Sequence, residues 1–121
     1  MSNFEINGNE YELKLTWESV KYLNKKIEGG SMGLVGQALM GDLDIFADIV
    51  HAGLFHTGEK FTLAKVEKQI EASFAEGKLD AIGIMRLSNE VISESFFYKP
   101  LITKLLADSP EAQEQMTKLL S

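Results

Sequence analysis

The sequence has no cysteine, a single arginine and no apolar run long enough to span a bilayer. The absence of cysteine excludes disulfides, cysteine-ligated zinc and thiol catalysis, and it fits a reducing compartment. The N-terminus has no basic segment followed by an apolar one, so we expect no secretory leader and a cytoplasmic location. The formal net charge is −6 and the lysines are dispersed. Binding to nucleic acid requires clustered Lys and Arg, so we expect no nucleic-acid partner. We expect no membrane partner either.

The composition is that of a folded domain. At 121 residues and 45% hydrophobic content, the chain has the size of one domain and too much apolar surface for a disordered one. We predict a single domain, residues 1–121, that is mainly α. An N-terminal β-hairpin packs on a small bundle of about five or six helices.

The hairpin is predicted over residues 4–15. Apolar and polar residues alternate on both arms, which gives one apolar face at a period of two. Asn7-Gly8 lies between the arms, and this pair favours a type I′ turn because both central positions need a positive φ. An isolated hairpin is marginal in water, so its apolar face is expected to lie on the helices.

The most apolar stretch, residues 43–55, is predicted to be the central helix of the core. Its apolar residues occupy most of the helical circumference, so other elements must cover it. Asp42 stands where an N-cap is expected, and Gly53 lies near the other end. At about a dozen residues the stretch is too short to cross a membrane.

Three polar residues interrupt this stretch at one-turn spacing: Asp44, Asp48 and His51, with His56 nearby. Two carboxylates and an imidazole on one stripe can hold a metal ion or form an acid–base pair. The alternative is a solvated stripe, or charges that cap the first helical turn. The stretch lacks a recognised metal spacing such as HExxH, so we favour the alternative. We therefore predict no catalytic residue, no metal ligand and no cofactor.

Helical spacing and end signals predict the other helices. They cover about 17–28, 32–40, 63–76, 79–99, 101–107 and 110–120. Thr16 and Thr62 are expected N-caps, and Trp17 and Phe74 are expected in the apolar core stripes of the helices that follow them. Pro100 is expected to end the helix over 79–99, because the residue before a proline is disfavoured in the α region.

The segment that leads through the helix over 32–40 contains three glycines, Gly33, Gly36 and Gly41. Glycine disfavours the helical state, so this helix is expected to be short. Their presence is explained either by close helix packing or by a hinge, and we favour packing.

The densest late apolar cluster supplies the candidate partner-binding residues: Phe96, Phe97, Tyr98, Leu101 and Leu105. Adjacent aromatic residues point in different directions on a helix, so one core cannot easily take all three. Some of this surface is then free to meet another chain, where Phe and Tyr often serve as anchors. The alternative is a core filled from two sides by the hairpin and the central helix, and the sequence leaves both open.

The order of these elements, with their short phrases, resembles a known family. The phrases are NEYELKLTWESVKYLNKK, GDLDIFADIVHAGLFH and FTLAKVEKQIE, which lie within residues 4–92. They are similar to those of the tail assembly chaperones encoded by long-tailed phages and prophages of Gram-positive bacteria. The resemblance implies a non-enzymatic factor in the host cytoplasm that binds the tape measure protein and helps tail tube protein assemble around it. It implies self-association, and it carries no catalytic residues.

Two further hypotheses follow from this resemblance. A homo-oligomer joined through apolar surface is expected, with Phe97, Tyr98, Leu101 and Leu105 as the first candidates for the interface. The competing function is a phage structural component, either a head–tail connector or a tail completion protein, which would stay in the finished particle.

Overall fold

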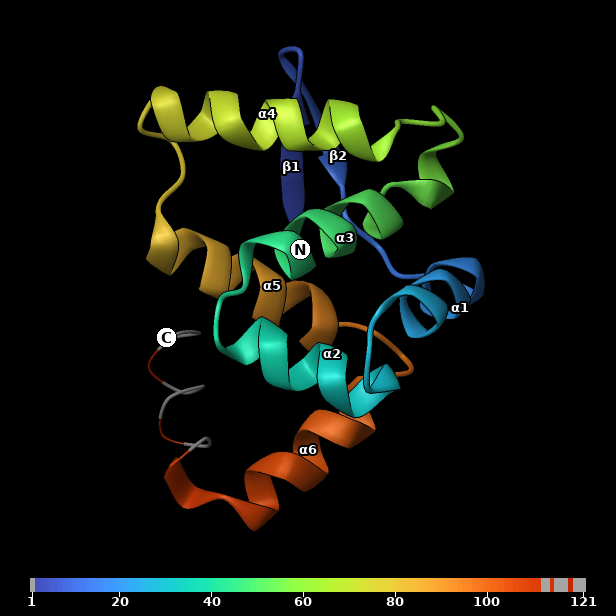
Figure 1. Ribbon diagram of the computed structural model, residues 1–121, viewed down its shortest axis with the longest axis vertical. Helices are drawn as coiled ribbons and strands as arrows, with labels where there is room; N and C mark the ends of the chain where they lie inside the picture. Colours follow the sequence, from blue (N-terminus) through green and yellow to red (C-terminus); the bar gives the residue numbers. More distant parts are fainter. Residues whose placement is uncertain (1, 112–113, 115–117, 119–121) are drawn as a thin grey trace.

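The computed structural model describes residues 2–111, 114 and 118 of the chain (Figure 1). Its elements, in order, are β1 (Asn3–Ile6), β2 (Asn9–Glu12), α1 (Trp17–Lys26), α2 (Gly30–Leu39), α3 (Leu43–Gly53), the 3-10 turn η1 (Phe55–Thr57), α4 (Leu63–Ala75), α5 (Ala81–Ser93) and α6 (Lys99–Asp108). The predicted class, mainly α with an N-terminal hairpin, is confirmed. In the described part of the chain no helix has the length and apolar character to cross a membrane. The helix predicted over 110–120 lies mostly outside the described residues.

The hairpin is shorter than predicted, but its turn is as expected. β1 and β2 are antiparallel, and Asn7 and Gly8 both have positive φ, 53° and 84°. β2 ends at Glu12, and one further backbone hydrogen bond runs from the Leu13 amide to the Ser2 carbonyl at 2.7 Å. The Lys14 amide instead donates to the carbonyl of Gly53, 3.0 Å away, and this bond ties the chain to the end of α3.

Helix α3 is the centre of the fold, as predicted. Phe46, Ile49 and Val50 are fully buried, and α3 packs against α1, α2, α4 and α5 (Figure 1). The side chain of Asp42 accepts a hydrogen bond from the Ile45 amide at 2.9 Å, which confirms the expected N-cap.

The expected caps of α1 and α4 are also confirmed, since Thr16 and Thr62 each accept a backbone hydrogen bond three residues later. The predicted core stripes of these two helices were wrong at Trp17 and Phe74. The side chain of Trp17 is 64% exposed, and that of Phe74 is exposed as well. Trp17 opens α1 and Phe74 stands in the last turn of α4, so both lie at helix ends, beyond the packed middle.

The glycine-rich segment forms the regular helix α2, and close packing explains Gly33. A Cβ built on Gly33 would stand 2.3 Å from the carbonyl oxygen of Glu28. No such neighbour faces Gly36, within the described residues. The packing explanation therefore holds at Gly33 and not at Gly36. It also holds at Gly41, which follows α2, because a Cβ there would stand 2.5 Å from the Cγ of Met85.

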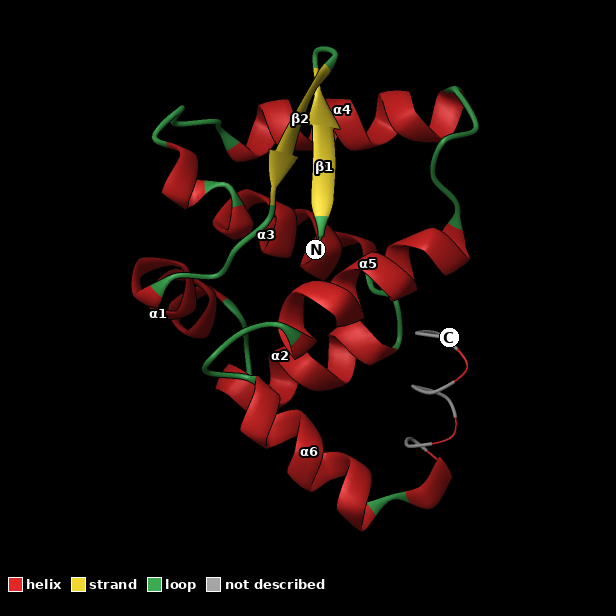
Figure 2. Ribbon diagram, turned by 180° about the vertical axis from the view of Figure 1, so that it is seen from behind, coloured by secondary structure: helices red, strands yellow, loops and turns green. Residues whose placement is uncertain are grey.

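The predicted helix over 79–99 was wrong at both ends. Asp80 caps α5 by accepting from the Gly83 amide at 2.7 Å, and α5 already ends at Ser93. The Ser95 hydroxyl accepts from the next turn's amides, including that of Phe97 at 3.3 Å. Pro100 lies in the first turn of α6, where its missing N–H costs nothing, instead of ending a helix. Figure 2 shows α6 at the opposite end of the molecule from α4.

Candidate functional site

Two of the three polar residues of α3, Asp48 and His51, form a hydrogen-bonded relay to α1. Asp48 is buried, and its carboxylate accepts from the ammonium of Lys26 at 2.6 Å. The same ammonium donates to the hydroxyl of Tyr22 at 3.2 Å. Burial lowers the pKa of Lys26, but the hydrogen bonds to Asp48 and Tyr22 and the attraction of Asp48 outweigh it, so the pKa is raised. The solvated-stripe interpretation was wrong for Asp48.

His51 continues this relay to the loop before α4. Its Nε2 lies 2.9 Å from the carbonyl oxygen of Phe61, and because a carbonyl only accepts, Nε2 carries the proton. Its Nδ1 lies 3.3 Å from the hydroxyl of Tyr22, which donates to it in the neutral imidazole. Burial is the main cause that lowers the pKa of His51, and the charge of Lys26 adds to it. Both ring nitrogens are engaged in hydrogen bonds, which tie α3 to α1 and to the loop before α4.

The other candidates for a metal or acid–base site do not join His51. Asp44 is exposed on the first turn of α3, and His56 is exposed with its Nε2 2.7 Å from the carbonyl oxygen of Glu12 in the hairpin. The described residues contain no group of three or more His, Asp or Glu side chains placed to hold a metal ion.

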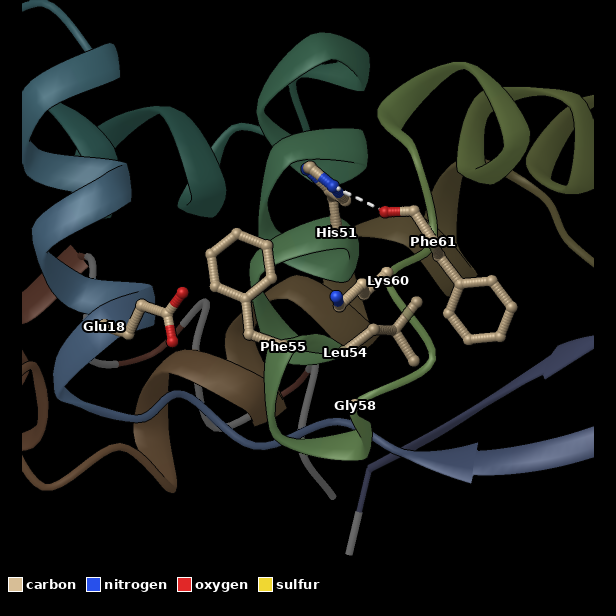
Figure 3. A pocket seen from close by; sticks show the side chains of 7 residues that line it. All are labelled: Glu18, His51, Leu54, Phe55, Gly58, Lys60 and Phe61. Carbon is tan, nitrogen blue, oxygen red and sulfur yellow. Dashed lines mark hydrogen bonds between the residues drawn. The ribbon is translucent and has the colours of Figure 1, made fainter.

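A cavity of about 410 Å³ lies beside His51 (Figure 3). Its lining residues are Glu18, His51, Leu54, Phe55, Gly58, Lys60 and Phe61. The ring of Phe55 packs edge-on against the imidazole at 5.2 Å, and the hydrogen bond between His51 and Phe61 closes one wall. The imidazole forms part of the wall of this space, and the side chains of Glu18 and Lys60 are its charged lining residues.

The five predicted partner-binding residues divide into exposed and covered positions. Phe96 is 60% exposed and Phe97 is 38% exposed, both on the turn between α5 and α6. Leu101 and Leu105 on α6 are half-buried and pack against the core. Tyr98 is fully buried, and its ring meets that of Phe97 at 5.2 Å.

Tyr98 is therefore a core residue, and a direct partner contact by its side chain is incompatible with this structure. Its hydroxyl donates to the side-chain oxygen of Asn24 at 3.0 Å, and Ser31 donates to the same oxygen at 3.2 Å. Burial raises the pKa of Tyr98 to about 12. The residue thus links the α5–α6 turn to α1 and α2.

Sequence reasoning missed several exposed apolar side chains outside this cluster. They are Trp17, Met32, Met40, Leu43, Phe74 and Ile82. Leu43 and Phe74 line a groove between α3 and α4. The near-complete apolar circumference of residues 43–55 was a usable signal, since a helix apolar on all sides is hard to cover completely.

The comparisons with known proteins agree with the resemblance seen in the sequence. The model of a family described as phage tail assembly chaperone protein, TAC, matches residues 3–106. The match extends into α6, which lies beyond the phrases that carried the resemblance. No curated protein and no solved structure matches the chain significantly. The family model extends from the hairpin into α6, over most of the chain, and the chain belongs to the phage tail assembly chaperone family.

Proposed function

We propose that this chain is a non-enzymatic chaperone that binds the tape measure protein and aids assembly of the tail tube around it. The observation that carries the proposal, beside family membership, is the set of large apolar side chains that project from a small, well-packed domain. These are Trp17, Met32, Met40, Leu43, Phe74, Ile82, Phe96 and Phe97. Two pairs among them are neighbours: the rings of Phe96 and Phe97 lie 6.4 Å apart, and Leu43 and Phe74 line one groove. Exposed apolar residues that lie together are typical of a surface that binds other chains.

The physical basis is the match between such side chains and a helical client. A client built of long amphipathic helices exposes apolar stripes, and a helical domain covers them by helix-in-groove contacts. The net charge of −6 keeps a loaded complex from aggregating, because complexes of like charge repel each other. Tails assemble inside the host cell, so the proposed location is the host cytoplasm.

The test is light scattering after size exclusion, with the chain alone and after co-expression with the tape measure protein of the same gene cluster. Co-elution, with the client staying in solution only when this chain is present, is the expected result. A chain that ignores the client contradicts the proposal. Recovery of the chain in purified virions would instead favour a head–tail connector or a tail completion protein.

We further propose that the chain self-associates through the exposed turn at Phe96 and Phe97 with the neighbouring Leu101 and Leu105. Phe97→Asp should release monomers, while Ile82→Asp, which charges another exposed apolar position, on α5, should not. Size exclusion with light scattering separates the two variants. An unchanged oligomer in Phe97→Asp counts against this choice of surface.

A further inference from the structure

Helices α3 and α4 lie side by side (Figure 1), and a groove runs between them. The groove has a volume of about 260 Å³, and its lining residues are Leu43, Asp44, Ala47, Glu67, Ile70, Glu71 and Phe74. Ala47 and Ile70 are buried in its floor, while Leu43 is 58% exposed and Phe74 is exposed at its rim. The floor and part of the rim are therefore apolar.

A second hollow of about 190 Å³ adjoins the first and shares Asp44, Ala47 and Glu67 with it. It carries the groove along α4 as far as Leu63. From Leu63 to Phe74 the helix rises about 16 Å at 1.5 Å per residue, so the groove accepts about three turns of a partner helix.

The rim of this groove is acidic. The carboxylates of Asp44, Glu67 and Glu71 are exposed, and none of them has an ion-pair partner among the described residues. Of the described residues that line the two hollows, Lys26 is the one cation, and Asp48 already neutralises it at 2.6 Å. The groove thus combines an apolar floor with uncompensated negative charge on both helices that form its walls.

We propose that this groove binds one amphipathic helix of the tape measure protein, whose apolar ridge is flanked by Lys or Arg. The identity of the partner rests on the proposed function, whereas the chemistry of the helix follows from the groove alone. The apolar ridge fills the floor between Ala47 and Ile70, and the flanking cations meet the carboxylates of the rim. A second copy that docked through this same groove would bring two acidic rims face to face, and the like charges of Asp44, Glu67 and Glu71 oppose that contact.

The first experiment uses two synthetic helical peptides as probes. Both carry leucines at i, i+3, i+4 and i+7, flanked by lysines in one and by glutamates in the other. Binding to the full chain is measured by fluorescence anisotropy at low and high salt. The lysine-flanked peptide should bind, and its affinity should decrease at high salt. The glutamate-flanked peptide should not bind. Equal binding of both peptides, or of neither, overturns the proposal.

Charge reversal at the rim supplies the variant and a matched control. The double variant Glu67→Lys with Glu71→Lys should lower the affinity for the lysine-flanked peptide by at least about tenfold, because electrostatic attraction becomes repulsion. Glu10→Lys with Glu28→Lys makes the same change in net charge at exposed positions outside the groove, and it should leave the affinity within about twofold. Circular dichroism checks that both doubles are folded. Unchanged binding in the groove double refutes the assignment.

Co-expression with the tape measure protein separates this proposal from the proposed function. Loss of co-elution in the groove double but not in the control double supports the groove. If the groove double still co-elutes, the chaperone function stands and the groove assignment is wrong. If the wild type fails to co-elute, the proposed function fails and the peptide measurements alone decide the groove. If the groove double loses only self-association, its occupant is a second copy and the proposal is wrong.

Discussion

Removing the charge of Asp48 tests whether the buried ion pair holds α1 against α3. The Asp48 side chain is 9% exposed and that of Lys26 is 38% exposed. Removal of one partner from a fully buried pair costs about 3–5 kcal/mol, whereas exposed pairs contribute about 0–1 kcal/mol. The ammonium of Lys26 can turn to water when its partner is lost, so Asp48→Asn should lower the free energy of unfolding by about 1–3 kcal/mol.

The order of the two single substitutions is the sharper expectation. Lys26→Met leaves the carboxylate of Asp48 buried and unpaired, and this carboxylate has no route to water comparable with that of the lysine. Lys26→Met should therefore be more destabilising than Asp48→Asn. The measurement is urea unfolding at pH 7, from which the coupling of the pair follows through the double variant.

The matched control is the exposed pair of Lys78 and Glu5, whose charged atoms lie 3.4 Å apart. The ammonium of Lys78 also lies 3.1 Å from the carboxylate of Glu76. The coupling of Lys78 with Glu5, measured with Lys78→Met and Glu5→Gln, should be close to zero because water screens both groups. The coupling between Lys26 and Asp48 should reach about 1–2 kcal/mol, because less water screens it. Equal couplings in the two cycles, or a larger loss from Asp48→Asn than from Lys26→Met, would refute the reasoning.

Three further predictions concern pH and packing. Burial lowers the pKa of His51, so the unfolded chain takes up the proton first as the pH falls. The free energy of unfolding should therefore decrease as the pH drops below about 6.5. In a profile of urea midpoints against pH, His51→Gln should flatten this part of the curve. Burial raises the pKa of Tyr98 from 10.0 to about 12, so stability should also fall as pH rises through that interval, and Tyr98→Phe should remove this loss while costing about 1 kcal/mol at pH 7. Gly33→Ala should destabilise by at least about 2 kcal/mol, since its Cβ would stand 2.3 Å from the Glu28 carbonyl oxygen, whereas Gly36→Ala should stabilise by up to about 1 kcal/mol in thermal unfolding.

The features that sequence predicted correctly depend on neighbours within a few residues. The Asn7-Gly8 turn and the caps at Thr16, Asp42 and Thr62 each rest on one side chain and the backbone beside it. The break after α5 is also local, but the apolar period runs on past Ser93 and hides it. Pro100 suits the first turn of a helix as well as the position after its end, so its presence did not decide between the two.

The features that sequence missed depend on what lies across the fold. Asp48 finds its cation on another helix, 22 residues earlier in the chain. Tyr98 is covered because Asn24 and the core reach it from α1, while its neighbour Phe97 in the same turn stays 38% exposed. The spacing of residues along one helix predicts neither the partner of Asp48 nor the burial of Tyr98. For the same reason it did not predict that Leu43 and Phe74 are exposed. The groove could not be predicted before the relative placement of α3 and α4 was known.

The relay and the groove are connected through α3 and the start of α4. Asp48 and His51 fix α3 to α1, and the hydrogen bond from His51 to the Phe61 carbonyl fixes the loop two residues before α4 begins. Ala47, beside Asp48 in sequence, lies in the groove floor. The polar relay therefore holds both walls of the groove in place before a partner arrives. A preformed groove loses less conformational entropy on binding than one that must be ordered, so the buried polar side chains of α3 serve the proposed recognition of a client without touching it.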